Sequence, residues 1–207
     1  MDWDEYIKWG KEAVVWGSEY RKNLRNYPVR SQNKPGETFN SIPTNPPENP
    51  ESIEQIFDDF KKIILPGITH WQHPRFFAYF PANAAPAYVF AEILTNTMGL
   101  QCMLWQTSPS ATELEEKVIE WLRISLDIPK GFGGIIQDTA SSATLTAILT
   151  MRETALNWKG NKVGLSGQGK LRIYASTENH SSLDKAIWFS GIGEDNLVRV
   201  PVYGAYR

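Results

Sequence analysis

The chain has 207 residues, a formal net charge of −2 and a single cysteine, Cys102, and these features exclude several classes of protein. At about 100–200 residues per domain, this length allows one domain, or one domain with a long arm. The balance of 21 Lys and Arg against 23 Asp and Glu indicates no nucleic-acid partner. One cysteine excludes an internal disulfide and a cysteine-based zinc site, and it favours a reducing, cytoplasmic compartment.

No stretch of the sequence predicts a membrane span or a targeting segment. The apolar runs fall short of the roughly 18 residues that a span requires, and residues 2–5 include three acidic side chains. The chain is rich in aromatic residues, with 8 Trp, 8 Tyr and 9 Phe. Such content is typical of a large interface or an aromatic-lined pocket, and an aromatic-rich core is an equally good explanation.

The first half of the sequence predicts helices around a proline-rich segment. Apolar residues recur at helical spacing over residues 4–24. Residues 27–50 hold six of the 13 prolines and predict an extended strap, which we expect to wrap around a partner with the preceding helix. Ser52, with Gln55 three residues later, predicts a capping box at the start of a helix whose apolar stripe runs to residue 64.

The second half changes to an alternation of helices and strands. Helices are expected over residues 86–98 and from Ser108-Pro109 to about residue 125, where the serine takes the N-cap position. The later part of the sequence predicts a strand at 133–137, a helix at 143–158, a strand at 171–176, a short helix after residue 180 and a strand at 197–200. This alternation predicts a parallel sheet of about three strands with crossover helices.

Two polar segments lie where an α/β sheet binds its ligands. The loop 138–142 opens onto a predicted helix, whose free N–H groups and dipole favour an anion, although Ser141 or Thr139 acting as an ordinary cap explains the loop equally simply. His180 follows a predicted strand, at the carboxyl edge where ligands gather. His70 and His73 have no third ligand nearby, so no metal site is expected.

Several motifs together resemble one enzyme family. They are ITHW at 68–71 with FFAYFP at 76–81, WQTSP at 105–109 with TELE at 112–115, IIQDTASSATL at 135–145, and YAS at 174–176 with HSS at 180–182. In order and spacing they resemble the group II pyridoxal-phosphate-dependent decarboxylases, in the aromatic-L-amino-acid decarboxylase branch. The resemblance covers almost the whole chain.

The resemblance implies an α/β fold of the fold-type-I PLP-dependent transferase class. Residues 1–85 match an N-terminal helical arm with its strap, which forms the dimer and contributes to an aromatic pocket. Residues 86–207 match only the first part of the large, parallel-sheet, PLP-binding domain. The activity implied is decarboxylation of an aromatic L-amino acid to its amine and CO2 by a cytoplasmic homodimer that uses pyridoxal 5′-phosphate.

The resemblance also assigns roles to single residues. Ala140 and Ser141 match the positions that hold the cofactor phosphate, and His180 matches the histidine that stacks on the pyridine ring and orients the substrate. The positions that match the pocket for the aromatic side chain are Trp71, Tyr79, Phe80 and Pro81. Met103 and Trp105 match a segment that such dimers lend to the neighbouring active site, and Met103 is expected to contact substrate.

Three departures from the family pattern bear on these roles. Asp138 replaces a glycine of the animal enzymes beside the phosphate loop, so its carboxylate is expected to face solvent or a backbone amide. Met103 replaces an aromatic residue. No lysine of this sequence lies in an Asn-Pro-His-Lys-like segment, which supplies the Schiff-base lysine, and no His-Val-Asp-Ala-Ala-like segment occurs. The resemblance therefore implies an amino-terminal portion that is inactive alone.

Other functions remain open at this point. A relative could act on histidine or glutamate, or could form an aldehyde, although the aromatic residues around Tyr79 argue against glutamate. A different class of explanation is a non-catalytic dimerisation fragment or remnant, or one part of a split enzyme.

Overall fold

The structure is a computed structural model that describes residues 2–80 and 85–204. The chain divides into two compact units, Met1–Gly99 and Leu100–Arg207, and each is described by itself. No helix within the described residues is long and apolar enough to cross a membrane.

Local sequence signals set the helix starts of the first unit. Asp2 caps the first helix, because its carboxylate accepts hydrogen bonds from the N–H groups of Asp4 and Glu5 at 3.0 and 2.8 Å. Ser52 and Gln55 form the predicted capping box. The helices of this unit are α1 (Trp3–Asn23), α2 (Glu37–Ser41), α3 (Ile53–Asp59) and α4 (Pro86–Met98), with 3-10 turns at Leu24–Asn26 and Leu65–Gly67 and a π-turn at Phe60–Ile64.

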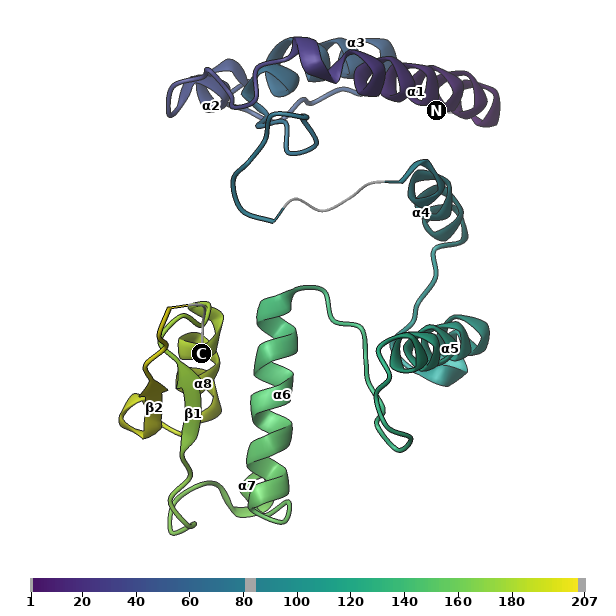
Figure 1. Ribbon diagram of the computed structural model, residues 1–207. Helices are drawn as coiled ribbons and strands as arrows, with labels where there is room; N and C mark the ends of the chain where they lie inside the picture. Colours follow the sequence, from purple (N-terminus) through teal and green to yellow (C-terminus); the bar gives the residue numbers. More distant parts are fainter. Residues whose placement is uncertain (1, 81–84, 205–207) are drawn as a thin grey trace. The chain divides into compact units, whose positions relative to one another are not determined.

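Helices α1 and α3 lie side by side and share an aromatic interior (Figure 1). The Trp16 ring stacks on Tyr20 with centroids 5.3 Å apart, and it meets Phe57 and Phe60 edge-on at 6.1 and 5.1 Å. Part of the aromatic content of α1 therefore packs on its own chain. Trp3, at the start of α1, is 77% exposed.

The proline-rich strap differs from its prediction at one place. The short helix α2 interrupts the expected extended chain between Pro35 and Pro43. Gly36 precedes it with φ of +87°, a conformation that favours glycine, and the Glu37 side chain accepts a hydrogen bond from the Lys34 N–H at 2.6 Å. A local turn with its own hydrogen bond allows five helical residues between the prolines.

The second unit contains the α/β part of the chain. Its elements are α5 (Pro109–Ser125), α6 (Ala140–Ala155), α7 (Gly160–Val163), β1 (Ile173–Ser176), α8 (Ser182–Ser190) and β2 (Leu197–Val200), with 3-10 turns at Trp105–Thr107 and Glu194–Asn196. Ser108 takes the predicted N-cap position of α5, but its side chain makes no capping hydrogen bond.

Strands β1 and β2 pair in parallel, with Ile173 opposite Leu197 and Ser176 opposite Val200, and α8 forms the crossover between them. The parallel βαβ arrangement confirms the predicted class of sheet. The prediction of a strand at 133–137 is wrong, because this segment pairs with no strand among the described residues. The backbone N–H of Ile136 instead donates to the Glu115 carboxylate at 2.8 Å.

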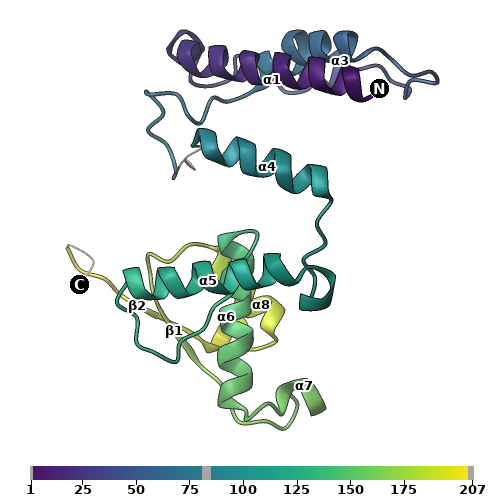
Figure 2. The same cartoon turned by 90° about the vertical axis from the view of Figure 1, so that its right-hand side faces the viewer.

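The small core of the second unit lies where α6 and α8 pack together (Figure 2). Ile148 of α6, Ala186 of α8 and Ile192 are buried, and Leu171 and Ile173 at β1 pack against them. This core holds α6, α8 and the strands in one body, so the loops at their ends have a rigid support.

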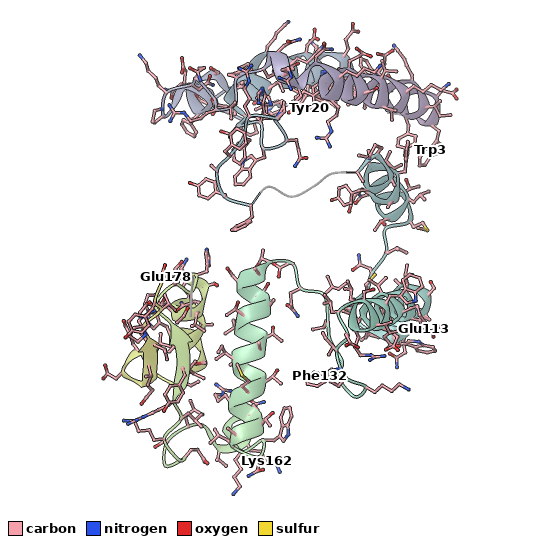
Figure 3. All side chains as sticks on the ribbon, viewed as in Figure 1. Trp3, Tyr20, Glu113, Phe132, Lys162 and Glu178 are labelled. Atoms are coloured by element: carbon pink, nitrogen blue, oxygen red, sulfur yellow. The ribbon has the colours of Figure 1, made fainter. Side chains whose placement is uncertain are left out.

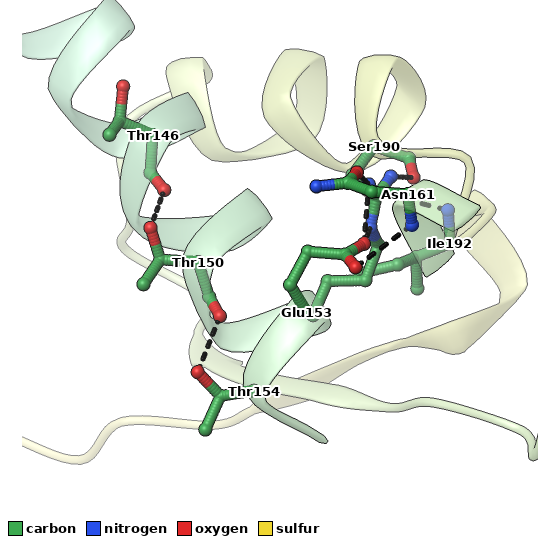
Figure 4. A network of polar contacts seen from close by, with 8 residues as sticks. Thr146, Thr150, Glu153, Thr154, Asn161, Ser190 and Ile192 are labelled. Atoms are coloured by element: carbon green, nitrogen blue, oxygen red, sulfur yellow. Dashed lines mark hydrogen bonds and ion pairs between the residues drawn. The ribbon is translucent and has the colours of Figure 1, made fainter. Parts of the chain in front are cut away.

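A buried polar network at the far end of α6 adds to this support (Figure 4). Glu153 is only 2% exposed and accepts hydrogen bonds from Arg152 at 2.9 Å and from the Asn161 N–H of α7 at 2.9 Å. Arg152 also donates to the carbonyl of Ser190, the last residue of α8, at 2.6 Å. The network joins the end of α6 to α7 and α8.

Candidate active site

The amino end of α6 is built by a capping motif. Thr139 is the N-cap, and its hydroxyl accepts a hydrogen bond from the Ser142 N–H at 3.2 Å. The Ser142 hydroxyl in turn accepts from the Thr139 N–H at 3.1 Å. This reciprocal pair fixes the first turn of α6 without using the next two backbone N–H groups.

Ala140 and Ser141 therefore present free donors at the head of a 16-residue helix. Their backbone N–H groups make no hydrogen bond to any residue that the structure describes, and both residues are exposed. The N–H groups of a first helical turn carry the positive end of the helix dipole. Ala140 and Ser141, the residues predicted to hold the phosphate, thus present two neighbouring N–H donors that suit an anion.

Asp138 precedes the N-cap of α6 and bonds to the first turn of this helix. Its exposed carboxylate accepts a hydrogen bond from the Ser142 hydroxyl, and this bond, with help from the backbone N–H groups of Asp138 and Thr139, lowers its pKa. The carboxylate faces solvent and backbone amides, as expected. It folds back toward Ser142, and the N–H groups of Ala140 and Ser141 have no partner within residues 2–80 and 85–204. The residues present fit a phosphate group.

His180 lies on the loop between β1 and α8. Its Nδ1 accepts a hydrogen bond from the backbone N–H of Ser182 at 3.1 Å and lies 3.0 Å from the Ser182 hydroxyl. Because a backbone N–H can only donate, Nδ1 is the acceptor and the proton of the neutral ring lies on Nε2. The side chain is exposed, so Nε2–H is free to meet a ligand.

The two segments lie at the same end of the second unit. Figure 3 places Glu178, in the loop that carries His180, at the height of the amino end of α6, while Lys162 marks the opposite end. The parallel strands end at this edge, where α/β folds bind ligands.

The structure brings together two of the predicted pocket residues in the first unit. The rings of Trp71 and Tyr79 stack with centroids 5.6 Å apart, and Phe76 packs on Trp71 at 4.9 Å. Tyr79 has φ of +54°, which is uncommon for a bulky residue. The stacked ring is held by a loop with a strained backbone, a feature that concentrates at functional sites.

Phe80, Met103 and Trp105 show no ring contact with Trp71 or Tyr79 among the described residues. Phe80 is fully exposed, and Pro81 lies outside the described residues. Met103 belongs to the second unit and is 73% exposed. Trp105 donates its indole N–H to the Glu113 carboxylate at 2.9 Å.

Among the described residues, no group of three or more His, Cys, Asp and Glu side chains could hold a metal ion. His70 and His73 instead make structural hydrogen bonds. The His70 Nδ1 lies 2.7 Å from the Tyr20 hydroxyl, and the His73 Nδ1 accepts from the Arg75 N–H at 3.0 Å.

One set of residues near the site was missed from the sequence. Arg199 of β2 binds both Asn179 and Asp184, which flank the loop of His180. No local pattern joins residues that are 15 and 20 positions apart. The available signal was the place of Asn179 and Arg199 near the carboxyl ends of two predicted strands.

A helix end with free N–H groups and a histidine loop lie on the carboxyl edge of a parallel sheet, which is the arrangement of an α/β protein with a candidate anion site. The model of the pyridoxal-dependent decarboxylase conserved domain matches residues 35–205, and the chain belongs to this family. The family is pyridoxal-dependent, which agrees with the phosphate-accepting end of α6.

Curated relatives in plants are similar over nearly the whole chain. Phenylacetaldehyde synthase of Arabidopsis thaliana is 38% identical over 202 residues, which are 95% of this chain. Tryptophan decarboxylase 2 of Oryza sativa and tyrosine decarboxylase of Papaver somniferum are each 38% identical, over 203 and 207 residues. The chain spans about 40% of the length of these relatives.

Solved structures have the same fold. Tryptophan decarboxylase of Catharanthus roseus in complex with L-tryptophan superposes with a TM-score of 0.88 at 35% identity, over 98% of this chain and 44% of that chain. Tryptophan decarboxylase of Oryza sativa with PLP and tryptamine gives 0.89 at 29% identity, over 98% and 42%. These matches confirm the predicted fold class, of which the chain contains a helical part and a small parallel sheet.

Proposed function

We propose that the protein decarboxylates an aromatic L-amino acid to its amine and CO2 with pyridoxal phosphate. The observation that carries this proposal is the pair of free N–H groups of Ala140 and Ser141 at the same end of the second unit as the His180 loop. Family membership and the aromatic substrates in the names of several relatives support it.

In this proposal each residue has a distinct task. The N–H groups of Ala140 and Ser141, with the Ser141 hydroxyl, hold the cofactor phosphate. His180 would stack on the cofactor ring, and its Nε2–H would be the donor available to the substrate. When bound, pyridoxal phosphate supplies the electron sink that lets the bond between Cα and the carboxylate break. Trp71, Tyr79, Phe80 and Pro81 exclude water and receive the aromatic side chain, and Met103 contacts the same substrate.

The proposal extends to the assembly and its compartment. We propose a cytoplasmic homodimer in which residues 1–85 form an arm on the partner and residues 86–207 contribute to the cofactor domain. No lysine of the 207 residues lies in the segment that forms the Schiff base in this family, so these residues alone are expected to release no amine.

A second candidate function is supported by a specific observation. Two similar proteins are named aldehyde synthases, the phenylacetaldehyde synthase of Arabidopsis thaliana and the 4-hydroxyphenylacetaldehyde synthase of Rhodiola rosea. Forming an aldehyde consumes O2 and releases ammonia and peroxide in addition to CO2, whereas simple decarboxylation releases only amine and CO2. Measuring these products in an enzyme completed with a portion that carries the Schiff-base lysine, with tryptophan, tyrosine, phenylalanine and dopa and with histidine and glutamate for comparison, separates the candidates. If no product forms with any of them, a non-catalytic dimerisation role is favoured.

The site assignment is tested by Ser141→Ala and His180→Gln. Loss of the Ser141 hydroxyl is expected to weaken PLP binding by about 1–3 kcal/mol, the cost of a charge-assisted hydrogen bond. His180→Gln is expected to lower kcat while PLP affinity changes little. Equilibrium dialysis with PLP measures the first effect, and turnover of an enzyme completed with a portion that carries the Schiff-base lysine measures the second. Ser110→Ala, a serine of α5, is the matched control. If Ser141→Ala binds PLP normally, the phosphate assignment is wrong.

A further inference from the structure

Arg199 connects β2 to the loop that carries His180. Its guanidinium donates a hydrogen bond to the Asn179 side-chain oxygen at 3.1 Å and forms an ion pair with the Asp184 carboxylate. Asn179 is in the loop, and Asp184 is in the first turn of α8. One side chain from a neighbouring strand thus holds both ends of the segment around His180.

Asn179 passes this restraint to His180 itself. Its amide nitrogen donates to the His180 carbonyl at 3.1 Å, and the same carbonyl accepts from the Leu183 N–H at 3.1 Å. The backbone of His180 is therefore fixed on the side of β2 and on the side of α8. With the backbone held in this place, Nδ1 of the ring accepts the hydrogen bond from the Ser182 N–H, and this bond leaves the ring proton on Nε2.

We propose that Arg199, acting through Asn179, is a positioning residue that sets the place and tautomer of His180. The inference rests on the proposed function, in which His180 faces cofactor and substrate. The guanidinium fork is suited to this task, because it binds a neutral amide oxygen and a carboxylate at the same time. A lysine in its place has one ammonium group and retains mainly the Asp184 contact.

Two conservative variants test separately the contact of Arg199 with Asn179 and the contact of Asn179 with the His180 carbonyl. Asn179→Asp keeps an oxygen acceptor for Arg199 but loses the donor to the His180 carbonyl. Arg199→Lys keeps a positive charge beside Asp184 but loses the fork. Matched controls are Asn157→Asp and Arg172→Lys, which make the same changes at exposed residues whose side chains form no hydrogen bond with the described part of the chain.

The first readout is the tautomer of His180, measured by nitrogen NMR of the protein with labelled histidine. Only three histidines are present, so a His180→Gln sample assigns the signal. The wild type is expected to show the Nε2–H tautomer. In each test variant the displaced ring is expected to lose the hydrogen bond from the Ser182 N–H to Nδ1. The ratio of Nε2–H to Nδ1–H then falls about fivefold, the factor for losing one ordinary hydrogen bond. The controls are expected to keep the ratio.

The second readout is steady-state kinetics. In the enzyme completed with a portion that carries the Schiff-base lysine, misplacement of His180 is expected to lower kcat about tenfold in each test variant, with KM and PLP affinity within about twofold of the wild type. The double variant is expected to lose no more than the more damaging single variant, because both residues act along one path.

An unchanged tautomer ratio in Asn179→Asp, an equal change in the controls, or additive losses in the double variant overturns the proposal. Absence of decarboxylation in the enzyme that is completed with a portion carrying the Schiff-base lysine contradicts the proposed function. The tautomer ratio still decides the positioning role in that case.

Discussion

The carboxylate of Asp138 lies at the end of α6 where we propose that a phosphate binds. Its hydrogen bond from Ser142 lowers its pKa, so it is ionised at neutral pH. Like charges repel, and this repulsion is screened by salt. Asp138 therefore limits the affinity of the site for phosphate while it stabilises the first turn of the helix.

Asp138→Asn is expected to strengthen PLP binding about two- to fivefold at low salt, because the amide oxygen still accepts from Ser142 but carries no charge. Equilibrium dialysis at low ionic strength and in about 1 M salt measures the effect, which is expected to disappear at the higher concentration. Asp127→Asn, at the end of α5, is the control for a general change of charge. Weaker binding by Asp138→Asn would show that its carboxylate helps to form the site.

Gly160 joins α6 to α7 through close contact with Glu153. A Cβ at Gly160 would lie 2.3 Å from the Glu153 carboxylate oxygen, and that buried carboxylate is held by Arg152 and by the Asn161 N–H. Gly160→Ala is expected to lower the free energy of unfolding by about 1–3 kcal/mol, because the buried group has no room to move. Urea unfolding measures it, and Gly169→Ala, in open space, is the control. Equal stability of the two variants contradicts this account.

The packing of α1 on the 65–73 segment depends on a buried, neutral histidine. Burial lowers the pKa of His70, with a smaller contribution from His73, and its Nδ1 meets the Tyr20 hydroxyl beside the Tyr27 ring. The unfolded chain takes up this proton near pH 6.5 and the folded unit does so only at lower pH. Its stability is therefore complete above about pH 6.5 and falls as the pH drops below that value.

Chemical unfolding of the first unit, followed by tryptophan fluorescence at pH 5 and pH 7.5, measures this dependence. His70→Gln is expected to flatten the pH profile. His180→Gln, an exposed histidine of the other unit, is expected to leave it unchanged. A wild-type profile without a decrease below pH 6.5 would show that His70 is protonated in the folded chain.

At the level of elements, sequence patterns predicted what is local. Helix starts at Ser52 and at the Ser108-Pro109 pair, and the parallel strands β1 and β2, follow from capping and periodicity within a few residues. The segment 133–137 has strand-like composition but no partner strand among the described residues, because strand formation depends on a neighbour. The contact of Arg199 with Asn179 likewise depends on the pairing of two strands. The location of the candidate site at the carboxyl edge of the sheet could therefore be predicted from the sequence. The hydrogen bonds within the site could not.

At the level of the whole molecule, exposed aromatic side chains are the feature to explain. In the first unit Trp3, Phe77 and Phe80 are 77%, 91% and 100% exposed. Aromatic side chains are enriched at protein–protein interfaces. They support the proposed homodimer, in which the arm packs on the partner subunit.

Analytical ultracentrifugation is expected to give twice the mass of one chain. Trp3→Ala is expected to weaken the dimer about tenfold, since truncation of an interface aromatic commonly costs more than 1 kcal/mol. Phe132→Ala, at an aromatic of the second unit that is 67% exposed and lies outside the arm, is expected to leave the association unchanged. A monomeric wild type contradicts the proposed assembly.

The crossover between β1 and β2 has a consequence for the order of folding. About 20 residues, including α8, separate the paired strands, and closing a loop of this length has a small entropic cost. Contacts that are close in sequence form fast. We expect β1, α8 and β2 to pair early in folding. The His180 loop, which joins β1 to α8, is then formed without help from segments that are distant in the sequence.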